Sequence, residues 1–77
     1  MFLEIISPDK KLFEGDIKSV TLPGSDGLLG ILNNHAPMIS ALKAGKVKIT
    51  DNSGVQTFTI KGGVVEVLKN KIIVLAE

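Results

Sequence analysis

The 77-residue sequence contains no cysteine, no arginine, no tryptophan and no tyrosine. Without cysteine, neither disulfides nor a thiolate metal site can stabilise the fold. Without arginine, bidentate recognition of phosphate or guanine and an arginine finger are excluded. Only Phe2, Phe13 and Phe58 are aromatic, which leaves little surface for stacking on bases. These absences argue against a nucleic-acid partner.

Long apolar runs are also absent. No stretch approaches the roughly 18 apolar residues that span a bilayer, and the first residues do not resemble a signal peptide. Nine lysines and eight acids give a net charge of +1, spread along the chain. We therefore expect a soluble cytoplasmic protein of one domain. A chain this short buries only about 60% of its unfolded surface, so an interface with a partner is a reasonable expectation.

The spacing of apolar residues is that of β-strands. Apolar or alternating runs end at Pro, Gly, Asn and Asp, with tight turns predicted at 51–54 and 69–70. The segment 38–42 is ambiguous, but Pro37 and Gly45 confine it to a short strand. Glycines at 24–30 separate short apolar pieces that predict bent strands. About nine short strands without a helix indicate an all-β, single-domain β-sandwich or flattened barrel.

Few residues could carry chemistry. His35 is the only histidine, and no nucleophile elbow or metal-ligand spacing accompanies it. We expect it to bond backbone groups of its loop or to contact a partner, and we expect no catalytic residue, metal or cofactor. Gly24, Gly27 and Gly30 match neither the dinucleotide fingerprint nor the P-loop, so turns and bulges explain them better.

Two further groups of residues have more than one interpretation. Glu14 and Asp16 share a face and could imitate an acid–base pair, but the nearby lysines favour a solvated mixed-charge surface. Four large apolar residues lie in the glycine-rich segment. They belong either to the core or, as an exposed subset, to a protein interface; they are Leu28, Leu29, Ile31 and Leu32.

Taken in order, the sequence resembles the epsilon subunit of F-type ATP synthases. Ser7-Pro8 with residues 12–15 resembles the family's opening, and residues 27–32 followed by His35-Ala36-Pro37 resemble its central signature. Residues 41–49 continue that signature, and residues 62–67 and 70–76 resemble the closing hairpin. The resemblance covers essentially the whole chain.

This resemblance implies a sandwich of about ten strands and a place in the rotor of a proton-translocating synthase. Such a domain is a non-catalytic subunit that packs against the gamma subunit and rests on the polar loops of the c-ring. It thereby helps to couple ion flow to ATP synthesis. The resemblance also implies a peripheral position on the cytoplasmic face of the energy-transducing membrane, with membrane association only through the complex.

The resemblance further implies contact residues. His35 matches a loop histidine near the gamma and ring contacts, and Asp26, Gly27 and Leu28 match a loop that faces the ring. Ser7 and Lys46 match positions on the gamma-facing side.

Three departures from the family pattern stand out. Leu28 replaces an acidic or polar residue, Asn33-Asn34 replaces a Pro-Gly-like pair, and a carboxy-terminal two-helix domain is absent from the 77 residues. Asparagine also tolerates the left-handed conformation that such a turn needs.

Two alternatives to a rotor subunit remain at this point. One is a free-standing ligand- or nucleotide-binding module that uses the glycine-rich loop. The other is a small enzyme built on His35, which ranks last.

Overall fold

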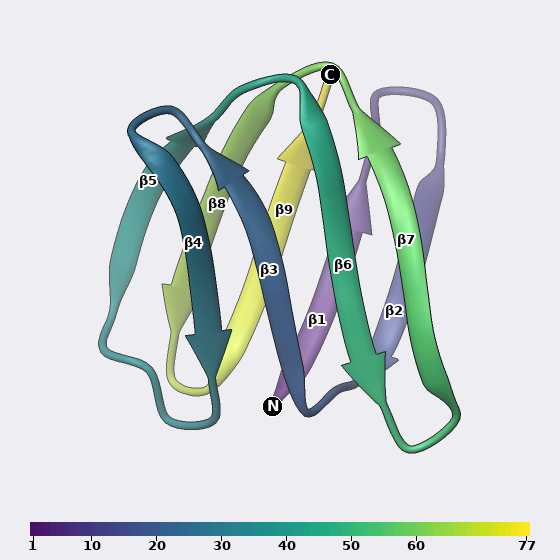
Figure 1. The fold of residues 1–77 in the computed structure, drawn as a ribbon, viewed down its shortest axis with the longest axis vertical. Helices are drawn as coiled ribbons and strands as arrows, with labels where there is room; N and C mark the ends of the chain where they lie inside the picture. The colour runs from purple at the N-terminus through teal and green to yellow at the C-terminus, as the bar shows by residue number, and fades with distance from the viewer.

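The computed structural model describes residues 1–77 and contains nine β-strands and no helix. In chain order (Figure 1) they are β1 (Phe2–Ile6), β2 (Lys11–Asp16), β3 (Ser19–Gly24), β4 (Gly27–Leu32), β5 (Met38–Leu42), β6 (Gly45–Asp51), β7 (Gly54–Ile60), β8 (Gly63–Leu68) and β9 (Lys71–Ala76). The all-β prediction is confirmed, and the ambiguous segment 38–42 is a strand.

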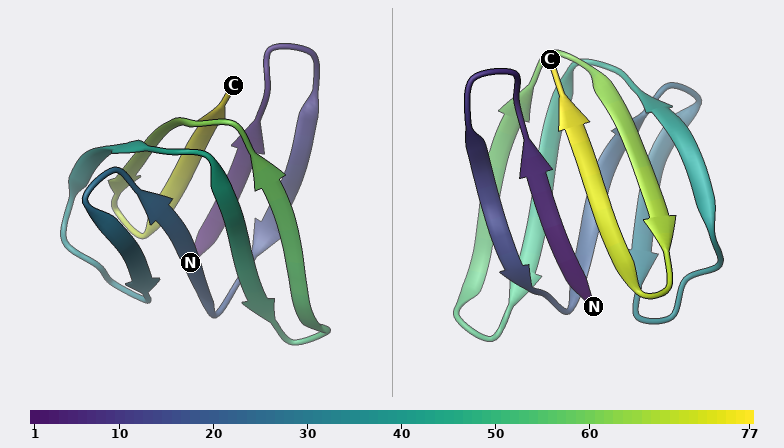
Figure 2. Two further views of the ribbon diagram at one scale, coloured as in Figure 1. Left: turned by 45° about the horizontal axis from the view of Figure 1, so that its top comes forward. Right: turned by 180° about the vertical axis from the view of Figure 1, so that it is seen from behind.

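The strands form one sheet that curls into two facing layers. One layer has the order β2-β1-β9-β8-β5, and the other has the order β4-β3-β6-β7. The layers join where Gly24 of β3 pairs with Leu42 of β5. Figures 1 and 2 show the two layers stacked, which is the predicted sandwich or flattened barrel. It is built from nine strands, close to the ten or so that the resemblance implied.

The first and last strands lie side by side. β1 and β9 pair in parallel, from Phe2 beside Lys71 to Ile6 beside Leu75. Every other pairing in the sheet is antiparallel. The right panel of Figure 2 shows β1 between β2 and β9. The fold therefore depends on a contact between the two ends of the described chain.

Alternation along the strands fills the space between the layers. Leu3 and Ile5 of β1, for example, point inward and are fully buried, because successive side chains of a strand point to opposite faces. No polar or charged residue is buried. The core consists of Leu3, Ile5, Ile17, Val20, Leu22, Ile31, Leu42, Val47, Ile49, Ile60, Val65, Val67, Ile72, Val74 and Ala76.

The predicted turns use residues that accept a positive φ. Gly54, with φ 127°, closes the β6–β7 turn, in which the backbone N–H of Ser53 donates to Asp51 Oδ1 at 2.7 Å. Lys69 and Asn70, with φ of 50° and 60°, form the two-residue β8–β9 turn. Two successive residues with positive φ match the twist of a hairpin, so the predicted turn is confirmed.

Candidate interaction surface

The outer face of β5, β8 and β9 carries a cluster of exposed apolar side chains, here called the apolar face. The alternation that buries Val65 and Val67 sends their neighbours on β8 outward. The cross-strand register then aligns outward-pointing residues of the three strands. The apolar face consists of Ile39, Val64, Leu68, Ile73 and Leu75, with Glu66 among them.

Four of the five apolar side chains of this face are exposed, and Ile73 is half-buried. Ile39 is 72% exposed and Leu75 is 54% exposed, although both lie in regular strands. Contiguous exposed apolar residues of this kind mark sites of protein interaction on small soluble domains. The apolar face therefore has the chemistry of a docking surface.

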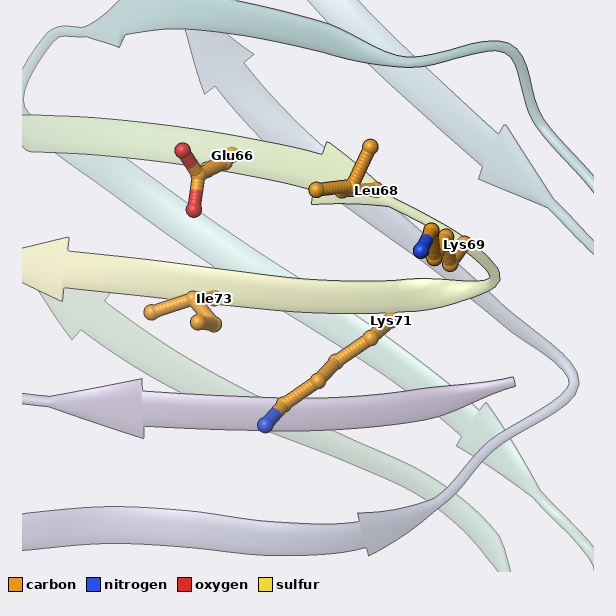
Figure 3. Close-up of a pocket in the computed structure, with 5 residues that line it drawn as sticks. All are labelled: Glu66, Leu68, Lys69, Lys71 and Ile73. Carbon is orange, nitrogen blue, oxygen red and sulfur yellow. The ribbon is translucent and has the colours of Figure 1, made fainter.

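The surface is hollowed at this face. Three shallow depressions occur in the structure, and Glu66 lines all of them. The largest, of about 410 Å³, lies between β5 and β8 and includes Met38 and Ile39. Figure 3 shows a second one, between Glu66 and Leu68 of β8 and Ile73 of β9. Lys69 and Lys71 also line the depression in Figure 3, whereas Glu66 is the only charged residue of the other two. The mostly apolar linings of those two suit apolar side chains of a partner.

A row of residues crosses this layer through Glu66. Ile39 of β5 pairs with Glu66, Glu66 with Ile73 of β9, Ile73 with Glu4 of β1, and Glu4 with Glu14 of β2. Lys11 lies 3.0 Å from Glu4 and 2.7 Å from Glu14. The hydrogen bond to Glu14, and to a smaller extent the hydrogen bond to Glu4, raises the pKa of Lys11 above its ordinary value. The mixed-charge interpretation of Glu14 is thus confirmed.

The residues predicted to contact partners lie elsewhere. Asp26, Gly27 and Leu28 are exposed and lie at the tip of the β3–β4 hairpin, at the upper end of Figure 1. The hairpin is held to β5 by Ser25, whose N–H donates to the carbonyl of Ala41 at 3.0 Å.

Ser7 and Lys46 are also found toward the upper end. Ser7 follows β1, and its Oγ lies 3.0 Å from the carbonyl oxygen and 3.2 Å from the backbone nitrogen of Lys10. Lys46 is exposed near the start of β6. It therefore belongs to the other layer from the apolar face.

His35 lies at the opposite end, in the β4–β5 loop at the bottom of Figure 1. The backbone N–H of His35 donates to the carbonyl of Leu32 at 3.2 Å, and the ring Nδ1 lies 2.8 Å from the carbonyl oxygen of Ala36. The expected bonding to backbone groups is confirmed. The structure does not bring His35 together with Asp26–Leu28, because the length of β4 separates the two loops. Their predicted contacts with partners stay predictions.

The glycine-rich segment divides between core and surface. Ile31 is buried and Leu29 is half-buried, whereas Leu28 is 77% and Leu32 is 66% exposed. The neighbouring Asn34 has φ 61°, the left-handed conformation expected of asparagine at this turn. Residues 24–30 form the end of β3, the turn after it and the start of β4, and they line none of the three depressions. No geometry here favours the nucleotide-binding alternative.

The remaining chemistry of the surface is sparse. The structure contains no group of three His, Cys, Asp or Glu side chains that could hold a metal. It also contains no helix of the length and apolarity needed to cross a membrane.

The apolar face was missed by reasoning from sequence, although a signal was present. Residues 64–65 and 72–75 are apolar at successive positions, so apolar side chains occupy both faces of these strands. Such runs are typical of strands covered on both sides. A consecutive apolar run in a strand of a two-layer sandwich therefore indicates that the outward face of that layer needs a covering partner.

Comparison with known proteins agrees with this architecture. Residues 1–77 match the family described as ATP synthase, Delta/Epsilon chain, beta-sandwich domain. The ATP synthase epsilon chain of Chlorobium limicola is 45% identical over 76 residues, which are 97% of this chain and 86% of that protein. The epsilon chain of Leptospira interrogans (strain 56601) is 37% identical over 75 residues, and the match spans 59% of its length.

Solved structures of the same kind share the fold. A chain in the central stalk and c-ring structure of the Tetrahymena thermophila mitochondrial ATP synthase superposes with a TM-score of 0.87 at 24% identity, over 99% of this chain and 62% of that one. A chain of the Euglena gracilis mitochondrial enzyme gives 0.89 at 18% identity, over 96% and 48%. These structures share the fold, and the match of residues 1–77 to the family together with 45% identity to an epsilon chain leads to one conclusion: this chain belongs to the epsilon-chain family of ATP synthases, non-catalytic subunits of that complex.

Proposed function

We propose that this chain docks the gamma subunit of a proton-translocating ATP synthase to the c-ring and so couples ion flow to ATP synthesis. It does this as a peripheral subunit on the cytoplasmic face of the membrane. The apolar face of β5, β8 and β9 carries the proposal, because exposed Ile39 and Leu75 need a partner to cover them. Epsilon chains are the relatives of this sequence, which makes a rotor subunit the partner to test first.

The proposal assigns the gamma subunit to the apolar face. A stable interface buries at least about 1,000 Å² in total, and an apolar centre surrounded by polar residues is its usual anatomy. Ser7 and Lys46 are the additional gamma-facing residues that the family resemblance suggests. The exposed Asp26–Leu28 hairpin and His35 are the proposed contacts with the polar loops of the ring.

Size-exclusion chromatography of the chain mixed with purified gamma subunit tests this function. We expect co-elution at micromolar concentration for the unchanged chain and for Val55→Asp, because Val55 is 58% exposed on the opposite layer. Ile39→Asp places a charge in the apolar face and should abolish co-elution. Independent elution of the unchanged chain would refute the proposal. Equal loss of binding in both variants would refute the assignment of the face.

A further inference from the structure

Glu66 lies at the centre of the apolar face and is the only charged residue in two of its three depressions, whereas Lys69 and Lys71 also line the third. In the row of paired residues that crosses the layer, it lies between Ile39 and Ile73, and it lines each of the three depressions. We infer that Glu66 determines partner specificity, by accepting a lysine or arginine that the docked segment presents within an apolar surface. This inference rests on the proposed docking function of the same face.

The other acids of the row already have a cation. Glu4 and Glu14 share Lys11, whereas Glu66 forms no salt bridge in the structure. Lys71, on the neighbouring strand, points away from Glu66 and lies over the ring of Phe2, 5.8 Å from its centroid. Figure 3 shows the Lys71 side chain extending across β1, with Glu66 on the other side of β9. The carboxylate of Glu66 is therefore free to pair with a group from outside the chain.

Docking changes the surroundings of this carboxylate. In the free chain Glu66 is exposed and water solvates it. A partner that covers Ile39 and Ile73 removes that water, and an ionised group without compensation is costly in such a place. The partner must supply a cation and hydrogen-bond donors at this position, or bind weakly. One acid within an apolar patch thereby rejects partners that are merely apolar.

The chemistry of the occupant follows from this pattern. It is an amphipathic segment whose exposed face carries one Lys or Arg, flanked by apolar side chains that fill the two depressions lined by both Ile39 and Glu66. Because the head group of either cation sits on a long apolar stem, it reaches Glu66 while the stem contacts the apolar face.

Binding of purified gamma subunit, measured by surface plasmon resonance, tests the inference. Glu66→Gln keeps the size of the side chain and removes its charge, and we expect it to raise Kd by about 30-fold or more, mainly through faster dissociation. Glu14→Gln is the matched control, outside the apolar face on β2 of the same layer, and should change Kd less than about threefold, because exposed surface pairs contribute little. In thermal melts, both variants should have a Tm close to that of the unchanged chain.

Charge reversal completes the test. Glu66→Lys should abolish binding, and one Lys→Glu or Arg→Glu variant of the gamma subunit should restore it. If Glu66→Gln binds like the unchanged chain while Ile39→Asp does not bind, the inference fails and the docking function stands. If no gamma variant restores binding to Glu66→Lys, the inference also fails. If the unchanged chain does not bind, both fail.

Discussion

The rings of Phe13 and Phe58 meet edge to face, with centroids 6.0 Å apart and planes inclined at 65°. Phe13 belongs to β2 and Phe58 to β7, which are the outermost strands of the two layers on one side of the sandwich. No backbone pairing joins these strands, so the aromatic contact closes that side of the core.

Removal of either ring should open this side. We expect Phe13→Ala and Phe58→Ala each to lower the free energy of unfolding by about 2–3 kcal/mol, less than for a fully buried ring. A double-mutant cycle in urea should show a coupling of about 0.5–1.5 kcal/mol. Additive effects would mean that the two rings act independently.

Gly63 cannot accept a side chain. Its φ is 148°, and a Cβ placed on it would overlap the carbonyl oxygen of Leu75 and lie 3.1 Å from the Cα of Ala76. We predict that Gly63→Ala lowers the free energy of unfolding by about 2 kcal/mol or more, from backbone strain and overlap together.

Gly30→Ala is the matched control for this change, because a Cβ there meets nothing within 4 Å. Its effect should stay within about 1 kcal/mol of neutral, since alanine loses less chain entropy than glycine on folding. Denaturation in urea measures both variants. Equal loss of stability would contradict the role of the close approach to β9.

The β8–β9 turn holds a lysine in an unfavourable conformation. Lys69 has φ 50°, which asparagine tolerates better than lysine does. Lys69→Asn should therefore stabilise the chain by about 0.5–1 kcal/mol. Asn70→Lys should destabilise it by about 1–2 kcal/mol, because the N–H of Asn34 donates to Asn70 Oδ1 at 2.8 Å and would lose this acceptor. In thermal melts, Tm should rise for Lys69→Asn and fall for Asn70→Lys.

The Lys11 bridge predicts a dependence on pH. Because the pKa of Lys11 is raised in the folded chain, its contribution to stability is fully present below the ordinary value of 10.5 and is lost as the pH rises through the raised pKa. The urea midpoint of the unchanged chain should exceed that of Lys11→Gln at pH 8. This difference should disappear at strongly alkaline pH and shrink in high salt. A constant difference across the alkaline range would refute the linkage.

The two proposed contacts with the c-ring, at Leu28 and at His35, can be tested separately in assembled complexes. Leu28→Asp should reduce ATP-driven proton pumping more than His35→Asp does, because Leu28 is 77% exposed whereas His35 is half-buried and bonds its own loop. Val55→Asp is the control on β7. Full pumping by both test variants would contradict the assignment of the ring contacts.

Much of this fold was predictable because its signals are local. The strand at Gly54–Ile60 and the turn before it follow from alternation and from residues that accept positive φ. The pairing of β1 with β9 was not predictable, because no local preference specifies a partner about seventy residues away. For the same reason, Ile31 could not be told from Leu32 as the buried residue before the facing layer was known.

The candidate site was predictable only in part. The loop residues Asp26–Leu28 and His35 were predicted as contacts through resemblance, which says nothing about their distance in space, and these contacts stay predictions. Glu66 was overlooked, because an acid within a run of apolar strand residues is ordinary in sequence. Its isolation appears only when β5 and β9 are placed on either side of it.

The parallel contact between β1 and β9 also constrains the order of folding. A nascent chain emerges from the ribosome with β1 first, and β1 can form its hairpin with β2 at once. Its other edge cannot pair until β9 is available. The layer that contains β1 and β9 therefore stays incomplete until almost the whole domain has been synthesised. During that interval an exposed strand edge is available for mispairing. Synthesis close to a partner or a chaperone would shorten this vulnerable period.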